Sequence, residues 1–253
     1  MNPAGHAAIV TGAASGLGEA TARALAAAGA KLALFDLNAA RAAQIAEAIG
    51  GVALACDVAS AASAEAAVEQ ARAAHGPARI MGNCAGIGTP GRVVGKEEPL
   101  PLEAFRRVIE VNLIGTFNLI RLMATGAAVL PPLDGGERGV IVNTASVAAF
   151  EGQIGQAAYA ASKGGVVGMT LPIARELARA GIRVCTIAPG IFETPMLRGL
   201  ASEVQASLAA SIPFPSRLGR PDEFARLVVH IVENQMLNGE TIRLDGAIRM
   251  PPR

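Results

Sequence analysis

Short apolar runs alternate along the chain with longer segments whose apolar positions follow a helical period. The runs lie at residues 7–11, 31–35, 51–56, 79–83, 140–144, 182–188 and 241–244, and continuous apolar character is typical of strands buried on both faces. Glycine and proline bound the helical segments, expected at 19–28, from 39, at 60–75, 102–127 and 157–180, and from 221. This alternation predicts a single α/β domain over residues 1–253, with a doubly wound parallel sheet of about seven strands and helices on both faces.

Three features depart from this regular alternation. Residues 89–101 are rich in glycine and proline and carry mixed charge, so we expect a loop that leaves the fold. Residues 194–217 are expected to form loop and short helix that cover a substrate. Asn112 interrupts the helix predicted at 102–127, and a polar amide there needs partners. It either caps a local kink or joins a hydrogen-bonded network.

Composition restricts the possible partners. Hydrophobic residues make up 51% of the chain and charged residues 17%, which argues against disorder. Lys and Arg number 22 against 21 acidic residues, and no basic cluster is visible. With one Tyr and no Trp, few side chains could stack on nucleic-acid bases. Glycine, proline or charge interrupts each apolar run before the roughly 18 residues needed to span a bilayer. We therefore expect neither a nucleic-acid partner nor a membrane partner.

Cysteine usage and the amino terminus bear on the compartment. Cys56, Cys84 and Cys185 are widely spaced in apolar surroundings, which is typical of reduced thiols in a cytosolic protein. No CxxC motif or His/Cys cluster is present, so we expect no metal site. Only six residues precede the first predicted strand, which leaves no room for a signal peptide. These features predict a cytoplasmic location.

A glycine-rich turn, from Thr11 to Gly18, follows the first predicted strand and precedes a helix. Gly12, Gly16 and Gly18 would let the backbone approach a pyrophosphate, whose charge the amides at the helix amino terminus would meet. The spacing Gly-x-x-x-Gly-x-Gly differs from the common dinucleotide fingerprint. A tight turn that binds no ligand therefore remains an alternative.

An acidic residue ends the second predicted strand. Asp36 could accept hydrogen bonds from the ribose hydroxyls of an adenosine and would repel a 2′-phosphate. Neither Leu37–Asn38 nor Ala14–Ser15 supplies a compensating cation, so the sequence favours NAD over NADP. Alternatively Asp36 caps the next helix, although Asn38 could do so equally well. Asp57 follows the third strand, where a ligand crevice would lie.

Three polar residues carry the candidate chemistry. Tyr159 and Lys163 lie at i and i+4 of a predicted helix and so project from one face, and Ser146 follows the fifth predicted strand. A free tyrosine titrates near about 10, and a fixed cation nearby lowers that pKa so that the phenol can take and return a proton. Ser146 would offer its hydroxyl to the same oxygen. The trio predicts alcohol and carbonyl chemistry, and the alternative is a buried tyrosine beside a solvated lysine.

Taken with Asn112 and the pairs Ala85-Gly86 and Pro189-Gly190, these motifs resemble the short-chain dehydrogenase/reductase family along nearly the whole chain. The resemblance implies a Rossmann-type fold. Cys84 stands where the family usually has an asparagine, and we expect little functional loss from it. Several segments resemble the type II 3-hydroxyacyl-CoA dehydrogenases, namely 139–165, 169–175, 213–219 and 237–250. That subgroup also acts on some hydroxysteroids and branched short-chain acyl-CoAs.

The resemblance implies NAD-dependent oxidation of a 3-hydroxyacyl-CoA to the 3-oxoacyl-CoA by a homotetramer. Tyr159 would be the general base, Lys163 would lower its pKa and bind the nicotinamide ribose, and Ser146 would hold the substrate oxygen. Asn112 would anchor a water that links Lys163 to solvent. Cofactor contacts are implied for Gly12, Ser15, Gly16, Leu17, Gly18, Asp36, Asp57, Val58, Cys84, Ala85, Gly86, Tyr159, Lys163, Pro189, Phe192 and Thr194.

The resemblance leaves some points open. The 89–101 loop matches a subgroup insertion, and its Arg92 and Lys96 could meet CoA phosphates. The mitochondrial leader of animal members has no counterpart here, which indicates a bacterial cytosolic version or a mature form. One alternative keeps the chemistry and changes the substrate to a steroid or another secondary alcohol. Another is a cofactor-binding scaffold that holds a partner protein and whose catalysis is vestigial.

Overall fold

The computed structural model describes residues 1–96, 98–198 and 201–252. Seven strands form one sheet in the order β3-β2-β1-β4-β5-β6-β7, and every neighbouring pair is parallel. The strands are β1 (Ala7–Thr11), β2 (Lys31–Asp36), β3 (Val52–Ala55), β4 (Ile80–Asn83), β5 (Gly139–Thr144), β6 (Ile182–Pro189) and β7 (Thr241–Leu244). The predicted doubly wound parallel sheet is confirmed, and each expected strand is present within a residue or two of its predicted bounds.

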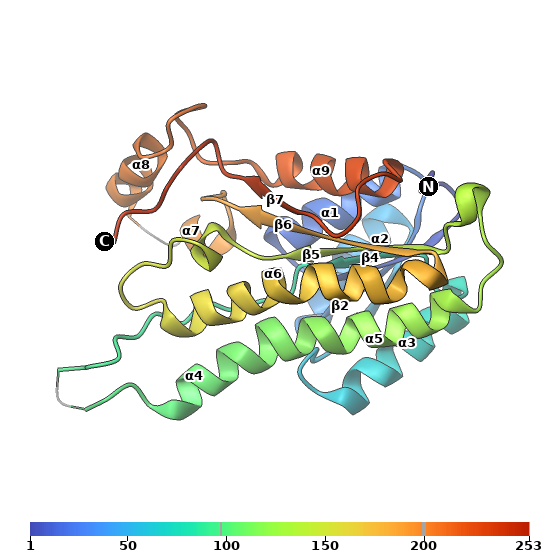
Figure 1. The fold of residues 1–253 in the computed structure, drawn as a ribbon, viewed down its shortest axis with the longest axis horizontal. Helices are drawn as coiled ribbons and strands as arrows, with labels where there is room; N and C mark the ends of the chain where they lie inside the picture. The colour runs from blue at the N-terminus through green and yellow to red at the C-terminus, as the bar shows by residue number, and fades with distance from the viewer. Residues whose placement is uncertain (97, 199–200, 253) are drawn as a thin grey trace.

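Helices cover both faces of the sheet (Figure 1). One layer packs on one face and contains α1 (Gly16–Ala27), α2 (Ala39–Ile49) and α9 (Pro221–Glu233). The other layer contains α3 (Ala61–His75), α5 (Gly115–Ala128) and α6 (Ala157–Leu177). Within β1, Ala8 and Val10 join the first core and Ile9 joins the second, so both faces of the strand are apolar. This burial on two sides explains why the strands are continuous apolar runs.

The long helix expected at 102–127 is divided in three. It consists of α4 (Leu102–Ile109), a π-helical segment (Glu110–Ile114) and α5. Asn112 lies inside the π-helical segment and is fully buried. A π segment contains one extra residue per turn, and such segments are frequent at functional sites.

The same helix bears on the expected absence of a membrane partner. From Leu102 to Ala128 the helix has the length and the apolar composition needed to cross a membrane. Charged residues and glycine nevertheless interrupt its apolar runs. Inside the protein, 56% of its most apolar window is buried, as in the core helix of a globular fold. The expected absence of a membrane partner stays a prediction.

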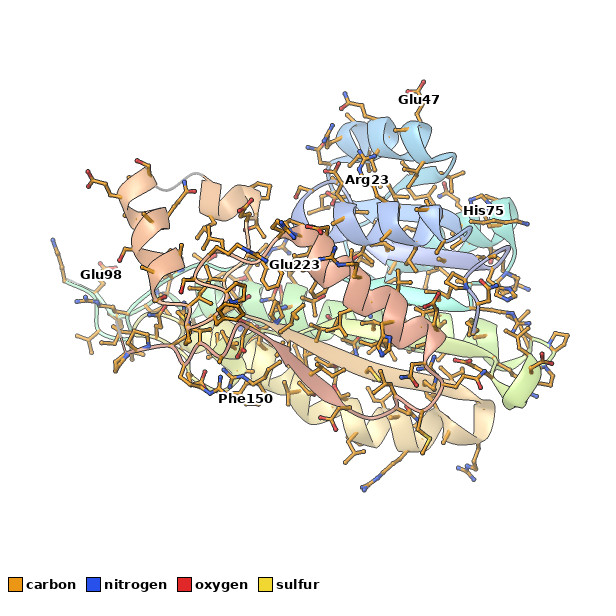
Figure 2. The ribbon with its side chains drawn as sticks, turned by 90° about the horizontal axis from the view of Figure 1, so that it is seen from above. Arg23, Glu47, His75, Glu98, Phe150 and Glu223 are labelled. Atoms are coloured by element: carbon orange, nitrogen blue, oxygen red, sulfur yellow. The ribbon has the colours of Figure 1, made fainter. Side chains whose placement is uncertain are left out.

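The loop expected to leave the fold and the segment expected to cover a substrate lie at one end of the molecule. Residues 89–96 and 98–101 and α8 (Ser202–Ala210) project from the same end in both views, and the labelled Glu98 marks the loop (Figures 1 and 2). Residue 97 of the expected loop lies outside the described residues. A shorter helix, α7 (Pro195–Arg198), precedes α8. Short 3-10 turns at Asp134–Gly136, Val147–Ala149 and Ala178–Ala180 complete the described elements. The expectation of loop and short helix in 194–217 is confirmed for the described residues.

Candidate active site

A cleft of about 940 Å³ runs along the carboxyl edge of the sheet. Residues that follow β1, β4, β5 and β6 line it, as expected for an open parallel sheet. All sixteen residues with implied cofactor contacts line this cleft, and so does Ser146. Of the four implied catalytic residues, only Asn112 does not line the cleft. The sequence motifs are therefore brought together in one place.

The glycine-rich turn forms a cradle at one end of the cleft. Gly12 has a φ of 63°, and a Cβ added there would lie 2.8 Å from the backbone nitrogen of Ala85. The helix begins at Gly16, three residues before the expected start at Glu19, because Gly18 lets its first turn pack directly on the backbone of Gly12. No side chain caps this helix amino terminus, which lies at the cleft. Free amides at a helix amino terminus suit a phosphate group.

Asp36 joins this cradle to β2. Its Oδ2 accepts a hydrogen bond from the Ala14 amide at 2.9 Å and its Oδ1 accepts one from the Asn38 amide at 2.8 Å. Asn38, rather than Asp36, caps α2 by accepting from the Arg41 amide at 3.1 Å. No ion pair found within the described ranges involves Asp36, and Arg41 pairs with Glu19 instead. The Asp36 carboxylate thus borders the cleft, and each of its oxygens can accept a further hydrogen bond.

Ser146, Tyr159 and Lys163 converge at the middle of the cleft. The Lys163 side chain is 4% exposed, and its Nζ donates to the Thr144 carbonyl at 2.8 Å and lies 5.7 Å from the centre of the Tyr159 ring. The Ser146 Oγ accepts from the Ala148 amide at 3.1 Å, and its own hydroxyl proton is directed to Tyr159, with which it shares a hydrogen bond. The arrangement offers a substrate oxygen one hydroxyl and one phenol.

The pKa values correct one expectation from the sequence. Burial raises the pKa of Tyr159, and a hydrogen bond with Ser146 opposes that rise. Burial also lowers the pKa of Lys163 from 10.5 to about 8. The expected lowering of the Tyr159 pKa by Lys163 is wrong for the protein's own groups. The reason is that the ammonium is itself desolvated and directs a proton to Thr144 rather than to the phenol oxygen.

Asn112 joins the network foreseen as one of its two possible roles. Its side-chain Oδ1 accepts from the Ile87 amide, and its Nδ2 donates to the Ile87 carbonyl, both at 2.8 Å. The Nδ2 also donates to the Ser162 Oγ at 3.0 Å, and Ser162 donates to the Tyr159 carbonyl at 2.7 Å. Asn112 therefore links the segment after β4 to the helix that carries Tyr159 and Lys163. The implied role as a water anchor stays a prediction.

Comparison with known proteins identifies the family. Residues 6–205 match the family model described as short chain dehydrogenase. The chain belongs to the short-chain dehydrogenase family. The 3-hydroxyacyl-CoA dehydrogenase type-2 of Bos taurus is 55% identical over 252 residues, which cover 98% of this chain and 97% of the relative. The protein of that name from Drosophila melanogaster is 53% identical over 248 residues, with coverage of 96% and 97%.

A solved structure extends the match to three dimensions. The crystal structure of 3-hydroxyacyl-CoA dehydrogenase type-2 from Mycobacterium avium superposes with a TM-score of 0.94 and is 44% identical. The match covers 98% of each chain. The family and the Rossmann-type fold that the sequence predicted are thus confirmed.

Some residues that line the cleft of this dehydrogenase were not singled out from the sequence. They include Arg107, Gln156, Ile191, Leu197 and Met250. Apart from its place in a segment similar to the subgroup, no motif in the sequence marks Met250. By contrast, Arg92 and Lys96 are exposed and do not line the cleft, so their implied contact with CoA phosphates stays a prediction.

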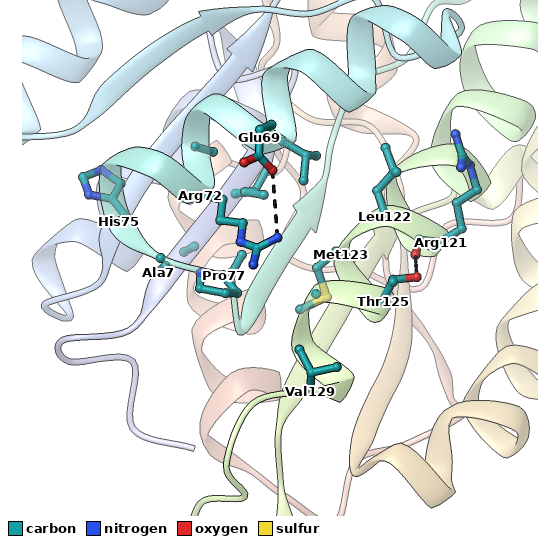
Figure 3. A pocket seen from close by; sticks show the side chains of 17 residues that line it. Ala7, Glu69, Arg72, His75, Pro77, Arg121, Leu122, Met123, Thr125 and Val129 are labelled. Carbon is teal, nitrogen blue, oxygen red and sulfur yellow. Dashed lines mark hydrogen bonds and ion pairs between the residues drawn. The ribbon is translucent and has the colours of Figure 1, made fainter.

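A second cavity, of about 540 Å³, lies at the amino edge of the same sheet (Figure 3). It is bounded by the ends of α3 and α5, with mostly small or apolar side chains as walls. Its charged groups sit at the rim, where Arg72 lies 3.9 Å from Glu69. No group of three or more His, Cys, Asp or Glu side chains that could hold a metal occurs in the part of the chain that the structure describes. The expected absence of a metal site stays a prediction.

Proposed function

We propose that this short-chain dehydrogenase uses NAD to interconvert a 3-hydroxyacyl-CoA and the corresponding 3-oxoacyl-CoA. The observation that carries the proposal is the convergence of Ser146, Tyr159 and Lys163 in a cleft that also contains a phosphate cradle. The substrate class follows from the relatives named 3-hydroxyacyl-CoA dehydrogenase type-2, which match nearly the whole chain.

The chain's own residues divide the chemistry between them. A nicotinamide dinucleotide held by the glycine cradle and Asp36 would supply the acceptor or donor of the hydride at the substrate carbon. The Ser146 hydroxyl donates a hydrogen bond to the substrate oxygen and holds that oxygen beside Tyr159. In oxidation the Tyr159 phenolate takes the hydroxyl proton, and in reduction the phenol returns a proton to the carbonyl oxygen. The buried Lys163 holds positive charge near the phenol when it is protonated, and Asn112 fixes the helix that carries both.

NAD is proposed over NADP because of Asp36. A 2′-phosphate would meet the Asp36 carboxylate, and the neighbouring Arg41 is held by Glu19 and Gln44. The glycine cradle and the uncapped helix amino terminus fit a pyrophosphate. The residues present therefore fit the dinucleotide that the resemblance implies.

The decisive experiment measures acetoacetyl-CoA reduction by the purified protein with NADH and with NADPH. We expect turnover with NADH to exceed that with NADPH. In Tyr159→Phe we expect kcat to fall by roughly a thousandfold, because the variant keeps the ring and loses the proton donor. NADH binding, followed by fluorescence, should persist in this variant and serves as the control. Robust turnover by Tyr159→Phe would contradict the mechanism.

The substrate alternative is tested with the same protein. A panel of hydroxysteroids and simple secondary alcohols is compared with acyl-CoA substrates by kcat/KM. A higher kcat/KM for a steroid would replace the acyl-CoA proposal and leave the proton chemistry intact. Loss of all turnover in the wild type, with NADH still bound, would favour the scaffold alternative.

We also infer a homotetramer in the cytoplasm. Exposed apolar side chains on the π-helical segment, α5 and α6 support self-association, since Ile114 is 49%, Phe117 50% and Leu171 44% exposed. Three free cysteines support a reducing compartment. Light scattering of the purified protein and cell fractionation test the two inferences separately.

A further inference from the structure

The last described segment of the chain, residues 245–252, has no helix or strand of its own. We call it the tail. It begins with a turn in which the Ala247 amide donates to the Asp245 Oδ1 at 3.0 Å. Its far end reaches the loop before α6, where the Ile154 amide donates to the Pro252 carbonyl at 3.0 Å. Specific contacts, rather than regular secondary structure, therefore set the path of the tail.

The strongest of these contacts form a group of four charged side chains, Arg243, Glu151, Asp245 and Arg249, which we call the clamp. Arg243, on β7, donates to both carboxylate oxygens of Glu151 at 2.7 and 2.8 Å and through Nε to Asp245 at 2.7 Å. Arg249 adds a bond to Asp245 at 3.2 Å. Phe150, labelled in Figure 2, lies 5.1 Å from the Arg243 guanidinium. Two cations and two carboxylates thus join β7, the tail and the loop before α6, in the bidentate geometry that suits arginine.

The tail places one side chain in the cleft. Met250 lines the cleft, as do Gln156 and Leu197, and packs against the small core formed by Ile212, Leu218 and Ile248. The tail follows β7, so the part of the cleft wall that contains Met250 lies beyond β6 in the strand order, away from β2 and Asp36. Because the cradle and Asp36 occupy the β1 and β2 side, the region near Met250 is the part of the cleft left for a substrate.

We propose that Met250 limits the size of the acyl group that the cleft accepts, and that the clamp is the positioning device that holds Met250 there. This inference rests on the proposed function, because it concerns the acyl end of the same substrate. A methionine side chain is long and adaptable, so it fills the end of an apolar pocket without a polar requirement. Glu151 belongs to the loop that leads to Tyr159, so the clamp fixes the wall relative to the catalytic helix.

The first test replaces Met250 by alanine and compares kcat/KM for medium-chain and short-chain 3-oxoacyl-CoA substrates with NADH. We expect the ratio of medium to short to rise by about tenfold, since a few methylene groups in an apolar pocket change discrimination by this order. Met236→Ala is the matched control, because Met236 is 92% exposed and lies outside the cleft. A ratio in Met250→Ala that equals that of the wild type overturns the role of Met250.

The second test removes the charge of the clamp. Glu151→Gln keeps the shape of the side chain and should raise the same ratio while kcat for the short substrate is retained. Glu151→Asp, which keeps the charge, should return the ratio toward the wild-type value. In the double variant Glu151→Gln/Met250→Ala, the ratio should rise no further than in Met250→Ala alone, because both changes act on one wall. If Glu151→Gln lowers thermal stability and leaves the ratio unchanged, the positioning role is overturned.

The outcomes separate this inference from the proposed function. Wild-type protein that reduces no 3-oxoacyl-CoA overturns the proposed function and this inference with it. Wild-type turnover together with an unchanged ratio in Met250→Ala overturns the inference alone.

Discussion

The two cavities lie at opposite edges of one sheet and differ in what they bury. The cleft at the carboxyl edge contains a lysine that is 4% exposed and is backed by the fully buried Asn112. The cavity at the amino edge has charges only at its rim, where Glu69 is 75% exposed. Parallel strands direct the following turns and helix amino termini to one edge only. Hollow space therefore occurs at both edges, whereas preorganised polar groups occur at one.

Outside the catalytic residues, the largest expected effect concerns the cradle, which has no counterpart in the second cavity. In Gly12→Ala the new Cβ would lie 2.8 Å from the Ala85 nitrogen, so we expect NADH affinity to fall by at least about a hundredfold. Gly50→Ala is the control, because Gly50 has a similar φ of 68° and no neighbour within 4 Å of the added Cβ. Titration of both variants with NADH separates the clash from backbone strain. Equal losses of NADH affinity in the two variants would contradict the proposed role of the cradle in binding the dinucleotide.

The next effect depends on the buried charge of Lys163, which lines the cleft and has no counterpart in the second cavity. The Lys163 pKa is lowered from 10.5 to about 8, so between these values the unfolded chain holds more protons than the folded one. The free energy of unfolding should therefore rise with pH across this window, by roughly 3 kcal/mol relative to Lys163→Met. Below about pH 8 both states are protonated and the difference should be constant.

Urea unfolding of the wild type and Lys163→Met at pH values on both sides of the window measures this difference. Lys31→Met, at an exposed position, controls for the loss of a lysine. A difference that falls or stays level as the pH rises would show that burial does not disfavour the charged amine.

Features that depend on local geometry were predictable from the sequence, whereas features that depend on tertiary contacts were not. The strands and the positions of Ser146, Tyr159 and Lys163 were predictable, because periodicity and spacing depend on local geometry. The pKa of Tyr159 was not, since its direction depends on burial by distant segments. Met250 was not singled out either, because the clamp joins residues 92 positions apart. The start of α1 was misplaced because Gly18 is read as a turn residue until its packing on Gly12 is seen.

The smallest expected effect is at the second cavity. Gly126 lies on α5 in its wall, and a Cβ added there would have only Pro77 nearby, at 3.9 Å. Gly126→Ala should raise the free energy of unfolding by up to about 1 kcal/mol, because alanine favours the helix. Its kcat/KM for acetoacetyl-CoA should equal that of the wild type. A changed kcat/KM, measured alongside thermal unfolding, would mean that the two edges of the sheet are coupled.

The π-helical segment Glu110–Ile114 has a consequence for how the chain tolerates length changes. Removing one residue from it would yield a more regular helix, which local propensity alone would favour. The deletion would also rotate α4 by about 100° relative to α5. The hydrogen bonds that Asn112 makes with Ile87 and Ser162 would then be lost. A shortened helix here would thus be better formed and functionally misaligned, so this irregular turn is where a one-residue deletion should be least acceptable.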